Sequence, residues 1–399
     1  MPVAIGTILF VDLLILFARS GNRALAGVLS FIAVILVVIV MHEFGHFVTA
    51  KAFRIKVTEF FVGFGPRVWS VRRGETEYGI KAVPAGGYVR IAGMNPFTEE
   101  PVEDQPRTFG AKPAWQRLIV LVSGAATHFL LVLLALVVYF WLVGVPIYGV
   151  AIGSVADRLD GRPSPAAIAG LEPGDQVLAV DDFENPTADE LIEYTRAHVG
   201  APIELVVERD GERLTFTVTP VLSDLEGERV GRLGVALAER RVIEREKRGL
   251  TTAVGESFAT TGGLTLEVTR RLGDVFGPKG FARLWDRLRG GEGSLDDPVG
   301  LVGAGRLAGQ AVESGSLDNF FGLFVGFNIF VGILNILPIP PLDGGHVLLL
   351  GIEKARGGRA VDIRRVIPVM AVVAGFLIIY TVLLLYADIF NPIPNPFGP

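Results

Sequence analysis

Long apolar runs alternate with long polar segments along the whole chain. Four of the runs reach or exceed the ~20 apolar residues that a helix needs to cross a bilayer. They cover residues 25–50, 115–143, 319–350 and 366–387. The pattern therefore predicts a polytopic α-helical membrane protein with four core transmembrane helices.

A shorter apolar run precedes the first span. It covers residues 3–18 and carries Asp12 near its middle. A cleavable signal peptide begins with a basic segment, and none precedes this run. We therefore expect an extra membrane helix within residues 1–24, which would be the fifth of the chain.

The positions of Lys and Arg predict the orientation in the membrane. Basic residues concentrate in segments 51–114 and 351–365, and short loops of this kind stay in the cytoplasm. The long polar region 145–318 and the tail 391–399 are then expected outside. The two arginines that precede residue 25 fit less well, because an extra N-terminal helix would place them outside.

Composition narrows the class of protein further. Half of the residues are hydrophobic, which is typical of a membrane protein. The net charge of -5 gives no basic field for nucleic acid, so we expect no such partner. The chain contains no cysteine, so any metal site must use histidine and carboxylate ligands.

Residues 145–222 predict a compact α/β module. "GLEPGDQVLAVDD" combines a Pro-Gly turn with a strand, and Thr187 followed by Glu190 forms a capping box at a helix start. Asp210 and Gly211 join two strands of alternating polarity. The combination resembles a PDZ domain, which binds an extended peptide as an added strand. A small α/β module without a ligand is the alternative.

Residues 223–318 are expected to form an amphipathic linker region. Within it, "SFATTGGLTLEVTRRLGDVF" predicts an amphipathic helix. Such a helix suits the membrane surface or contact with a substrate.

His42, Glu43 and His46 spell H-E-x-x-H inside the first apolar span. Histidines four residues apart on a helix share one face, so both imidazoles can reach a single ion. The glutamate can polarise a water without being a ligand, and zinc suits this donor set. Burying such groups in lipid costs several kcal/mol unless something satisfies them. Two histidines at metal spacing therefore argue against a chance match.

Asp343 is the best candidate for a third ligand. It follows a run of prolines and precedes two glycines, and broken helix at membrane depth is tolerated where it lines a cavity. A carboxylate inside the membrane is a functional site by default. Glu59, Glu75 and Glu77 are the alternatives, but they lie in a segment that predicts strand and turn.

Together, H-E-F-G-H in the first core span, L-D-G-G in the third and the PDZ-like module between them resemble the site-2 protease family of intramembrane zinc metalloproteases. The resemblance covers residues 25–390, in order. It implies one zinc ion per chain, held by His42, His46 and Asp343, with Glu43 as general base.

The nearest type is the bacterial one with an extracytoplasmic PDZ domain, which cleaves membrane-anchored anti-sigma factors. The resemblance therefore implies regulated intramembrane proteolysis of a single-pass membrane protein in the bacterial cell membrane. It also implies a peptide ligand for the PDZ domain and a zinc site near the cytoplasmic face.

Two further segments match the family. "YGIKAVPAGGYVRIAGM" (78–94) has strand-like halves, and similar segments in relatives form a membrane-associated β-hairpin that pairs with unwound substrate. This implies substrate contacts for Gly86, Gly87, Tyr88 and Val89; a hairpin that only packs the loop is the alternative.

The resemblance also gives Asn328 a role in holding substrate backbone. An interhelical hydrogen bond is the alternative for this residue. Asn335, seven residues further on the same span, is a weaker candidate for substrate contact.

The second span departs from the family pattern. Relatives usually show Gly-Pro followed by an asparagine, whereas this chain has Ala125 and His128 at those places. His128 either does the polar work of the asparagine, lies next to the metal ligands, or packs with one hydrogen bond. His198 and His346 are expected to be bystanders.

Three other functions fit parts of the sequence. A transporter could use the histidines and Asp343 as a metal or proton path. A scaffold could bind peptides through the PDZ domain without catalysis. A membrane-anchored zinc protease could act on soluble substrates.

Overall fold

Four helices in the described part of the chain are long and apolar enough to cross a membrane. They cover Leu25–Ala52, Ala114–Val143, Leu317–Ile336 and Arg364–Phe390. These helices confirm the four predicted core spans.

The structure is a computed structural model that describes residues 23–94, 101–225, 228–314, 316–359 and 361–397. The expected extra helix at 3–18 lies outside the described residues. The chain separates into two compact units. We call them the membrane unit, which runs up to Ala135 and resumes at Gly255, and the inserted unit, Leu136–Val254.

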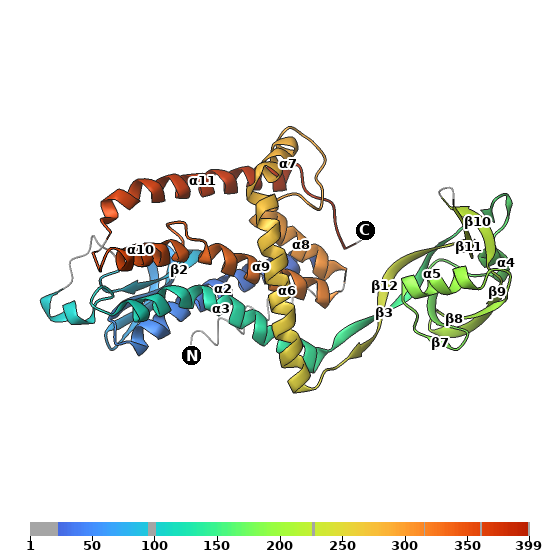
Figure 1. The fold of residues 1–399 in the computed structure, drawn as a ribbon, viewed down its shortest axis with the longest axis horizontal. Helices are drawn as coiled ribbons and strands as arrows, with labels where there is room; N and C mark the ends of the chain where they lie inside the picture. The colour runs from blue at the N-terminus through green and yellow to red at the C-terminus, as the bar shows by residue number, and fades with distance from the viewer. Residues whose placement is uncertain (1–22, 95–100, 226–227, 315, 360, 398–399) are drawn as a thin grey trace. The chain divides into compact units, whose positions relative to one another are not determined.

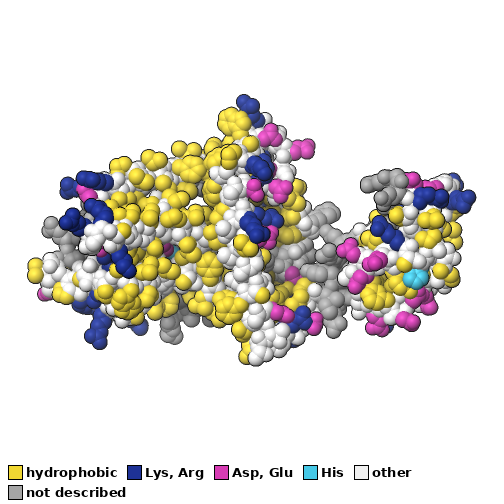
Figure 2. All heavy atoms as spheres, viewed as in Figure 1, with side chains coloured by type: hydrophobic (Ala, Val, Ile, Leu, Met, Phe, Trp, Pro, Cys, Tyr) yellow, Lys and Arg dark blue, Asp and Glu magenta, His cyan; other side chains and the backbone are white. Residues whose placement is uncertain are grey.

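Long helices build most of the membrane unit (Figure 1). In chain order they are α2 (Arg23–Ala52), α3 (Ala114–Val138), α6 (Leu250–Phe276), α7 (Pro278–Leu288), α8 (Leu301–Glu313), α9 (Leu317–Ile336), α10 (Asp343–Ala355) and α11 (Ile363–Phe390). The shorter elements of this unit are β1 (Val57–Arg73), β2 (Thr76–Ile91) and the 3-10 helix η1 (Val102–Arg107). The π-helical turn η2 (Tyr139–Val143) follows α3 and already belongs to the inserted unit. Hydrophobic side chains cover much of the visible surface over α10 and α11 (Figure 2).

The third predicted span is broken where its prolines fall. Helix α9 ends at Ile336 and α10 begins at Asp343. Proline lacks the backbone N–H that continues a helix, so the chain turns between them. The turn is tight, because a Cβ on Gly345 would lie 2.5 Å from Cα of Pro340. The break therefore places Asp343 at the start of a new helix.

Glycines let α2 approach two neighbouring helices. A Cβ on Gly45 would lie 2.6 Å from the carbonyl oxygen of Ser123 in α3. A Cβ on Gly27 would lie 2.5 Å from Cα of Gly309 in α8. Small residues at such crossings are typical of membrane helices, which gain stability from close packing.

The first half of β1 lies in the middle of its sheet. Phe60 is opposite Val89 on one side and opposite Tyr78 on the other. The predicted β-hairpin is present, but its two strands are β1 and β2, which turn between Arg73 and Thr76. The two halves of segment 78–94 do not pair with each other, which corrects the predicted position of the hairpin. The reason is the length of β1, whose first half separates them. Among the described strands, segment 87–91 pairs with β1 alone and forms an edge of the sheet.

A buried charged group joins α7 to the end of α11. Arg287 is only 1% exposed and donates a hydrogen bond of 2.7 Å to the carbonyl oxygen of Pro298. It also lies 3.5 Å from the carboxylate of Asp388 in α11. The backbone N–H of Gly303 donates to the same carboxylate at 2.8 Å. Part of the predicted linker region thus packs onto the last membrane helix.

The inserted unit contains the predicted α/β module. Its strands are β3 (Val145–Val155), β4 (Arg158–Leu159), β5 (Arg162–Pro163), β6 (Gln176–Val180), β7 (Phe183–Glu184), β8 (Ile203–Arg209), β9 (Glu212–Val218), β10 (Val221–Leu225), β11 (Glu228–Arg232) and β12 (Val235–Glu246). Its helices are α4 (Pro165–Ala169) and α5 (Ala188–Ala197). The main sheet has the strand order β12-β3-β6-β8-β9, with β7 beside β6.

Two local predictions for this module are confirmed. Helix α5 starts with the capping box of Thr187 and Glu190. Strands β8 and β9 are joined at Asp210 and Gly211, which both have positive φ, as a tight hairpin turn requires. A core of aliphatic side chains fills the space between sheet and helices.

The sheet continues beyond residue 222, where the sequence placed the end of the module. Strand β12 pairs with β3 from Val235 to Glu246. Its sequence, "VALAERRVIERE", is rich in charge and lacks the pattern of a core strand. The pairing is made by backbone hydrogen bonds to a strand far away in sequence, which a local pattern cannot show.

An ion pair inside the inserted unit predicts a pH-dependent stability. Burial by itself raises the pKa of Asp175, but hydrogen bonds from Arg209 and from the backbone N–H of Glu172 outweigh it and lower that pKa. This contribution to stability is fully present above the unfolded value of about 4 and is lost as the pH falls through the folded value.

Asp175→Asn should therefore destabilise the unit at pH 7 by about 2 kcal/mol and reduce its loss of stability in acid. Hydrogen–deuterium exchange of β6 and β8 in the full chain measures both effects. Glu172→Gln is the matched control, since Glu172 contacts the same arginine from an exposed position. Equal acid sensitivity in Asp175→Asn and the wild type would contradict the prediction.

Candidate metal centre

Three ligand atoms converge between α2 and the start of α10. The Nε2 atoms of His42 and His46 lie 3.2 Å apart. Oδ2 of Asp343 lies 3.2 Å from each of them. Among the described residues these three side chains form a group that could hold a metal ion. The structure thus brings together the three ligands predicted from the sequence.

A hydrogen bond sets the tautomer of His46. Its Nδ1 lies 2.7 Å from the carbonyl oxygen of Val120 in α3. A carbonyl oxygen can only accept, so Nδ1 carries the proton and Nε2 of the neutral ring presents a lone pair. This lone pair is directed at the carboxylate of Asp343 and at the other imidazole.

The arrangement fits a zinc ion. Oδ2 of Asp343 is buried and has no hydrogen-bond partner. Electron-rich atoms do not gather in a buried site unless a cation lies between them. Ligand atoms at about 2.0–2.1 Å from a tetrahedral zinc lie about 3.3 Å apart, close to the spacing of this triangle. Three protein ligands leave the fourth position open, as in catalytic zinc sites.

The alternative third ligands are used elsewhere. Glu59 accepts hydrogen bonds from Tyr88 and Arg90 in β2. Glu75 pairs with Lys51 and Arg107, and Glu77 pairs with Arg67. These carboxylates are neutralised by nearby cations, so Asp343 completes the group.

Glu43 lies beside the edge of the β-sheet. It follows His42 on α2 and is half-buried. A Cβ on Gly87 in β2 would lie 3.4 Å from Cγ of Glu43. The carboxylate is therefore next to the edge segment 87–91, where an extended chain could be added.

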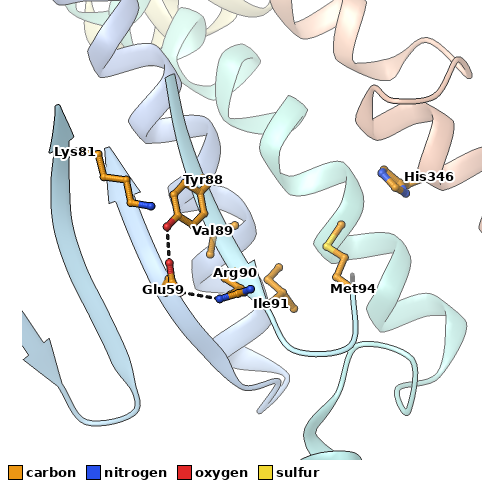
Figure 3. A pocket seen from close by; sticks show the side chains of 8 residues that line it. All are labelled: Glu59, Lys81, Tyr88, Val89, Arg90, Ile91, Met94 and His346. Carbon is orange, nitrogen blue, oxygen red and sulfur yellow. Dashed lines mark hydrogen bonds and ion pairs between the residues drawn. The ribbon is translucent and has the colours of Figure 1, made fainter. Parts of the chain in front are cut away.

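A cavity of about 570 Å³ lies along this edge. Figure 3 shows Tyr88 and Arg90 pointing toward Glu59 on one side, with His346 of α10 across from them. Val89 also lines the cavity, so the predicted substrate segment borders an open space. His346 contributes to this wall and is outside the ligand triangle.

The remaining predicted residues have other surroundings. Asn328 is fully buried, and its side chain bonds to Phe324 and lies near His128. It has no exposed surface to offer a substrate in this structure. His198 stacks on Tyr194 in the inserted unit.

Gly124 is a site residue that sequence reasoning missed. A Cβ on it would collide with Nε2 of His46 and lie 2.7 Å from Cε1 of His42. The imidazoles thus fit against bare backbone of α3. The "SGAATH" stretch contains this glycine, but only the crossing of α2 and α3 shows what lies against it.

Fold and site together define an integral-membrane protein with a helix-borne metal site and a carboxylate beside it, which is the equipment of a metal-dependent hydrolase. The chain belongs to Peptidase family M50, whose sequence profile matches residues 30–380. This match confirms the resemblance to site-2 proteases, and the chain is a membrane metalloprotease of that family.

Bacterial relatives are similar over most of the chain. Zinc metalloprotease Rip1 of Mycobacterium tuberculosis is 33% identical, and the match covers 92% of this chain and 98% of Rip1. Metalloprotease MmpA of Caulobacter vibrioides is 29% identical over 81% of this chain and 85% of its own length. Zinc metalloprotease RasP of Geobacillus kaustophilus is 28% identical, with 84% and 91% covered. The crystal structure of a PDZ domain from Listeria monocytogenes is 23% identical over 22% of this chain and 86% of its own, at a TM-score of 0.19.

Gly124→Ala should empty the metal site, because the added methyl group takes the space of the two imidazoles. We expect the zinc content of the purified protein, measured by mass spectrometry after dialysis, to fall as it does in His46→Ala. Gly255→Ala in α6 is the control, since a Cβ there meets nothing within 4 Å. Full zinc content in Gly124→Ala would show that the imidazoles lie elsewhere.

Proposed function

We propose that the protein is an intramembrane zinc metalloprotease. It hydrolyses a peptide bond in or beside the transmembrane segment of a single-pass membrane protein. The observation that carries this proposal is the convergence of His42, His46 and Asp343 on one point, beside Glu43, on a membrane-spanning helix and its neighbour. One zinc ion per chain would be held there.

Glu43 is the general base and acid of the proposed reaction. When bound, zinc supplies a Lewis acid that polarises the peptide carbonyl and activates water for attack. Glu43 accepts the proton that the attacking water loses and returns it to the nitrogen as the carbon–nitrogen bond breaks. Its half-buried position keeps bulk water away from this transfer.

The edge segment 87–91 is the proposed platform for the substrate. A transmembrane helix hides its peptide bonds in internal hydrogen bonds, so it must become extended before hydrolysis. An added strand satisfies its exposed backbone groups by pairing with a sheet edge. Gly86, Gly87, Tyr88 and Val89 belong to this region and would hold the substrate beside Glu43.

The inserted unit offers a second peptide site. A cavity of about 370 Å³ lies between α5 and the start of β12, with Leu191, Ile192 and Leu237 among its apolar walls. Strand β12 pairs with β3 on one side only within the described sheet. An extended peptide could be added to its other side, as PDZ domains do. Such binding would screen substrates before cleavage.

The proposed location is the bacterial cell membrane, with the zinc site near its cytoplasmic side. Lys51 lies in the last turn of α2, shortly after His46. Lys354 lies in the last turn of α10, the helix that Asp343 begins. Because positive charge stays inside, these ends face the cytoplasm and the inserted unit lies outside. Anti-sigma factors are the proposed substrates, by resemblance to the family.

Glu43→Gln should abolish cleavage while zinc stays bound. Removing a general base costs about 10²- to 10⁴-fold in rate, and the metal ligands are untouched. The assay follows cleavage of a co-expressed single-pass anti-sigma factor on immunoblots, with zinc content measured in parallel. Glu267→Gln is the control, because that glutamate forms an exposed pair with Arg271.

The Glu43→Gln variant, the zinc content and a soluble unfolded substrate together separate the other functions. A transporter would keep its function in Glu43→Gln, and a scaffold would hold no zinc. A protease for soluble substrates would cut a soluble unfolded protein as well as the embedded helix. Persistent cleavage by Glu43→Gln would refute the mechanism.

Single cysteines can test the substrate platform, since the chain has none of its own. In the Glu43→Gln background, Val89→Cys should form disulfides with cysteines placed near the scissile region of the substrate. Trp69→Cys is the matched control, because Trp69 pairs with Ile80 in the part of the sheet away from segment 87–91. Equal cross-linking at both positions would contradict strand addition at this edge.

A further inference from the structure

A chain of polar side chains connects three membrane helices behind the metal centre. Nδ1 of His42 in α2 lies 3.1 Å from Nε2 of His128 in α3. Nδ1 of His128 lies 3.5 Å from Oδ1 of Asn328 in α9. His128 is 1% exposed and Asn328 is fully buried. Polar groups in such a place must satisfy one another, because lipid and side chains around them cannot.

The amide of Asn328 determines which atoms donate and which accept along this series of hydrogen bonds. Its Nδ2 donates a hydrogen bond of 2.9 Å to the carbonyl oxygen of Phe324, one turn earlier in α9. A carbonyl oxygen only accepts, so the amide nitrogen must be the atom that faces it. The other end of the amide, Oδ1, is thereby directed at His128 as an acceptor.

The acceptor role of Asn328 determines where the proton of His128 lies, and His128 in turn determines where the proton of His42 lies. Because Oδ1 of Asn328 accepts, His128 must carry its proton on Nδ1 and present a lone pair on Nε2. That lone pair accepts the proton on Nδ1 of His42. His42 is then left with its own lone pair on Nε2, the atom that lies 3.2 Å from Asp343.

The reverse arrangement is unfavourable at Asn328 and obstructs the metal site at the other end. A proton on Nε2 of His128 would set its Nδ1 lone pair against the oxygen of Asn328. It would also place the proton of His42 on Nε2, where a metal would have to displace it. The buried amide therefore selects between two tautomers of a ligand that it does not touch.

We propose that His128 and Asn328 are positioning residues that hold His42 in the tautomer that binds the metal. They replace the carboxylate or carbonyl that usually accepts the second N–H of a ligating histidine. This gives Asn328 a different role from substrate binding, which its complete burial does not support. The proposal rests on the zinc site of the proposed function but not on its protease activity.

Zinc affinity of the purified full-length protein, measured by competition with a chelator, tests the chain. His128→Leu should weaken zinc binding about 10- to 100-fold, as loss of such a partner typically does. His128→Gln should largely restore it, because the glutamine oxygen can accept from His42. Asn328→Leu should also weaken zinc binding, although it is two residues removed from the metal.

The double variant separates proton direction from packing. In the His128→Gln background, Asn328→Leu should add almost nothing, because the glutamine accepts from His42 without help from Asn328. An equal loss in both backgrounds would mean that Asn328 acts by packing alone, and would overturn the proposal. Thr127→Val is the matched control, since the hydroxyl of Thr127 donates within its own helix, to the carbonyl oxygen of Gly124.

Nitrogen NMR gives a readout that a merely structural role would not move. The chain has five histidines, so ¹⁵N labelling of histidine gives few signals, which His→Gln variants assign. We expect protonated Nδ1 on His42 in the metal-free wild type and a mixture of tautomers in Asn328→Leu. An unchanged tautomer with unchanged affinity would overturn the proposal. A wild type that binds no zinc would instead refute the proposed function itself.

Discussion

Three lone pairs directed at one buried point are the constraint on which the membrane unit depends. Nε2 of His42, Nε2 of His46 and Oδ2 of Asp343 lie 3.2 Å from one another. Without a cation these atoms repel one another, and no interaction compensates for the hydration that each loses on burial. With one, their burial is offset by coordination. The break between α9 and α10 exists at the place where it can deliver the carboxylate to the two imidazoles.

The helices around the site provide both space and hydrogen bonds for the histidines. Helix α3 does both, with Gly124 leaving room for the rings and Val120 accepting the proton of His46. His128 receives the proton of His42 one turn further on. A metal-binding helix in lipid needs such a neighbour, because no water is present to orient the rings.

The β-sheet places extended backbone beside the metal centre. Peptide bonds within a membrane helix are closed to attack, and an extended segment in lipid needs partners for its N–H and C=O groups. The edge segment 87–91 lies beside Glu43 and borders a cavity. The arrangement places an open sheet edge beside the carboxylate of Glu43, and this combination suits the proposed cleavage of a chain that must first unwind.

The sequence by itself determined the features that depend on neighbours along the chain. Apolar runs predicted the four spans, the spacing of His42 and His46 predicted a shared ion, and Thr187 with Glu190 predicted a helix start. Asp343 could be nominated because a carboxylate in an apolar span is costly. Only the tertiary structure decided the sheet position of β12, the separation of the two halves of 78–94, and the places of Gly124 and Asn328. Those features depend on contacts between distant segments, and a local pattern contains no information on which segments meet.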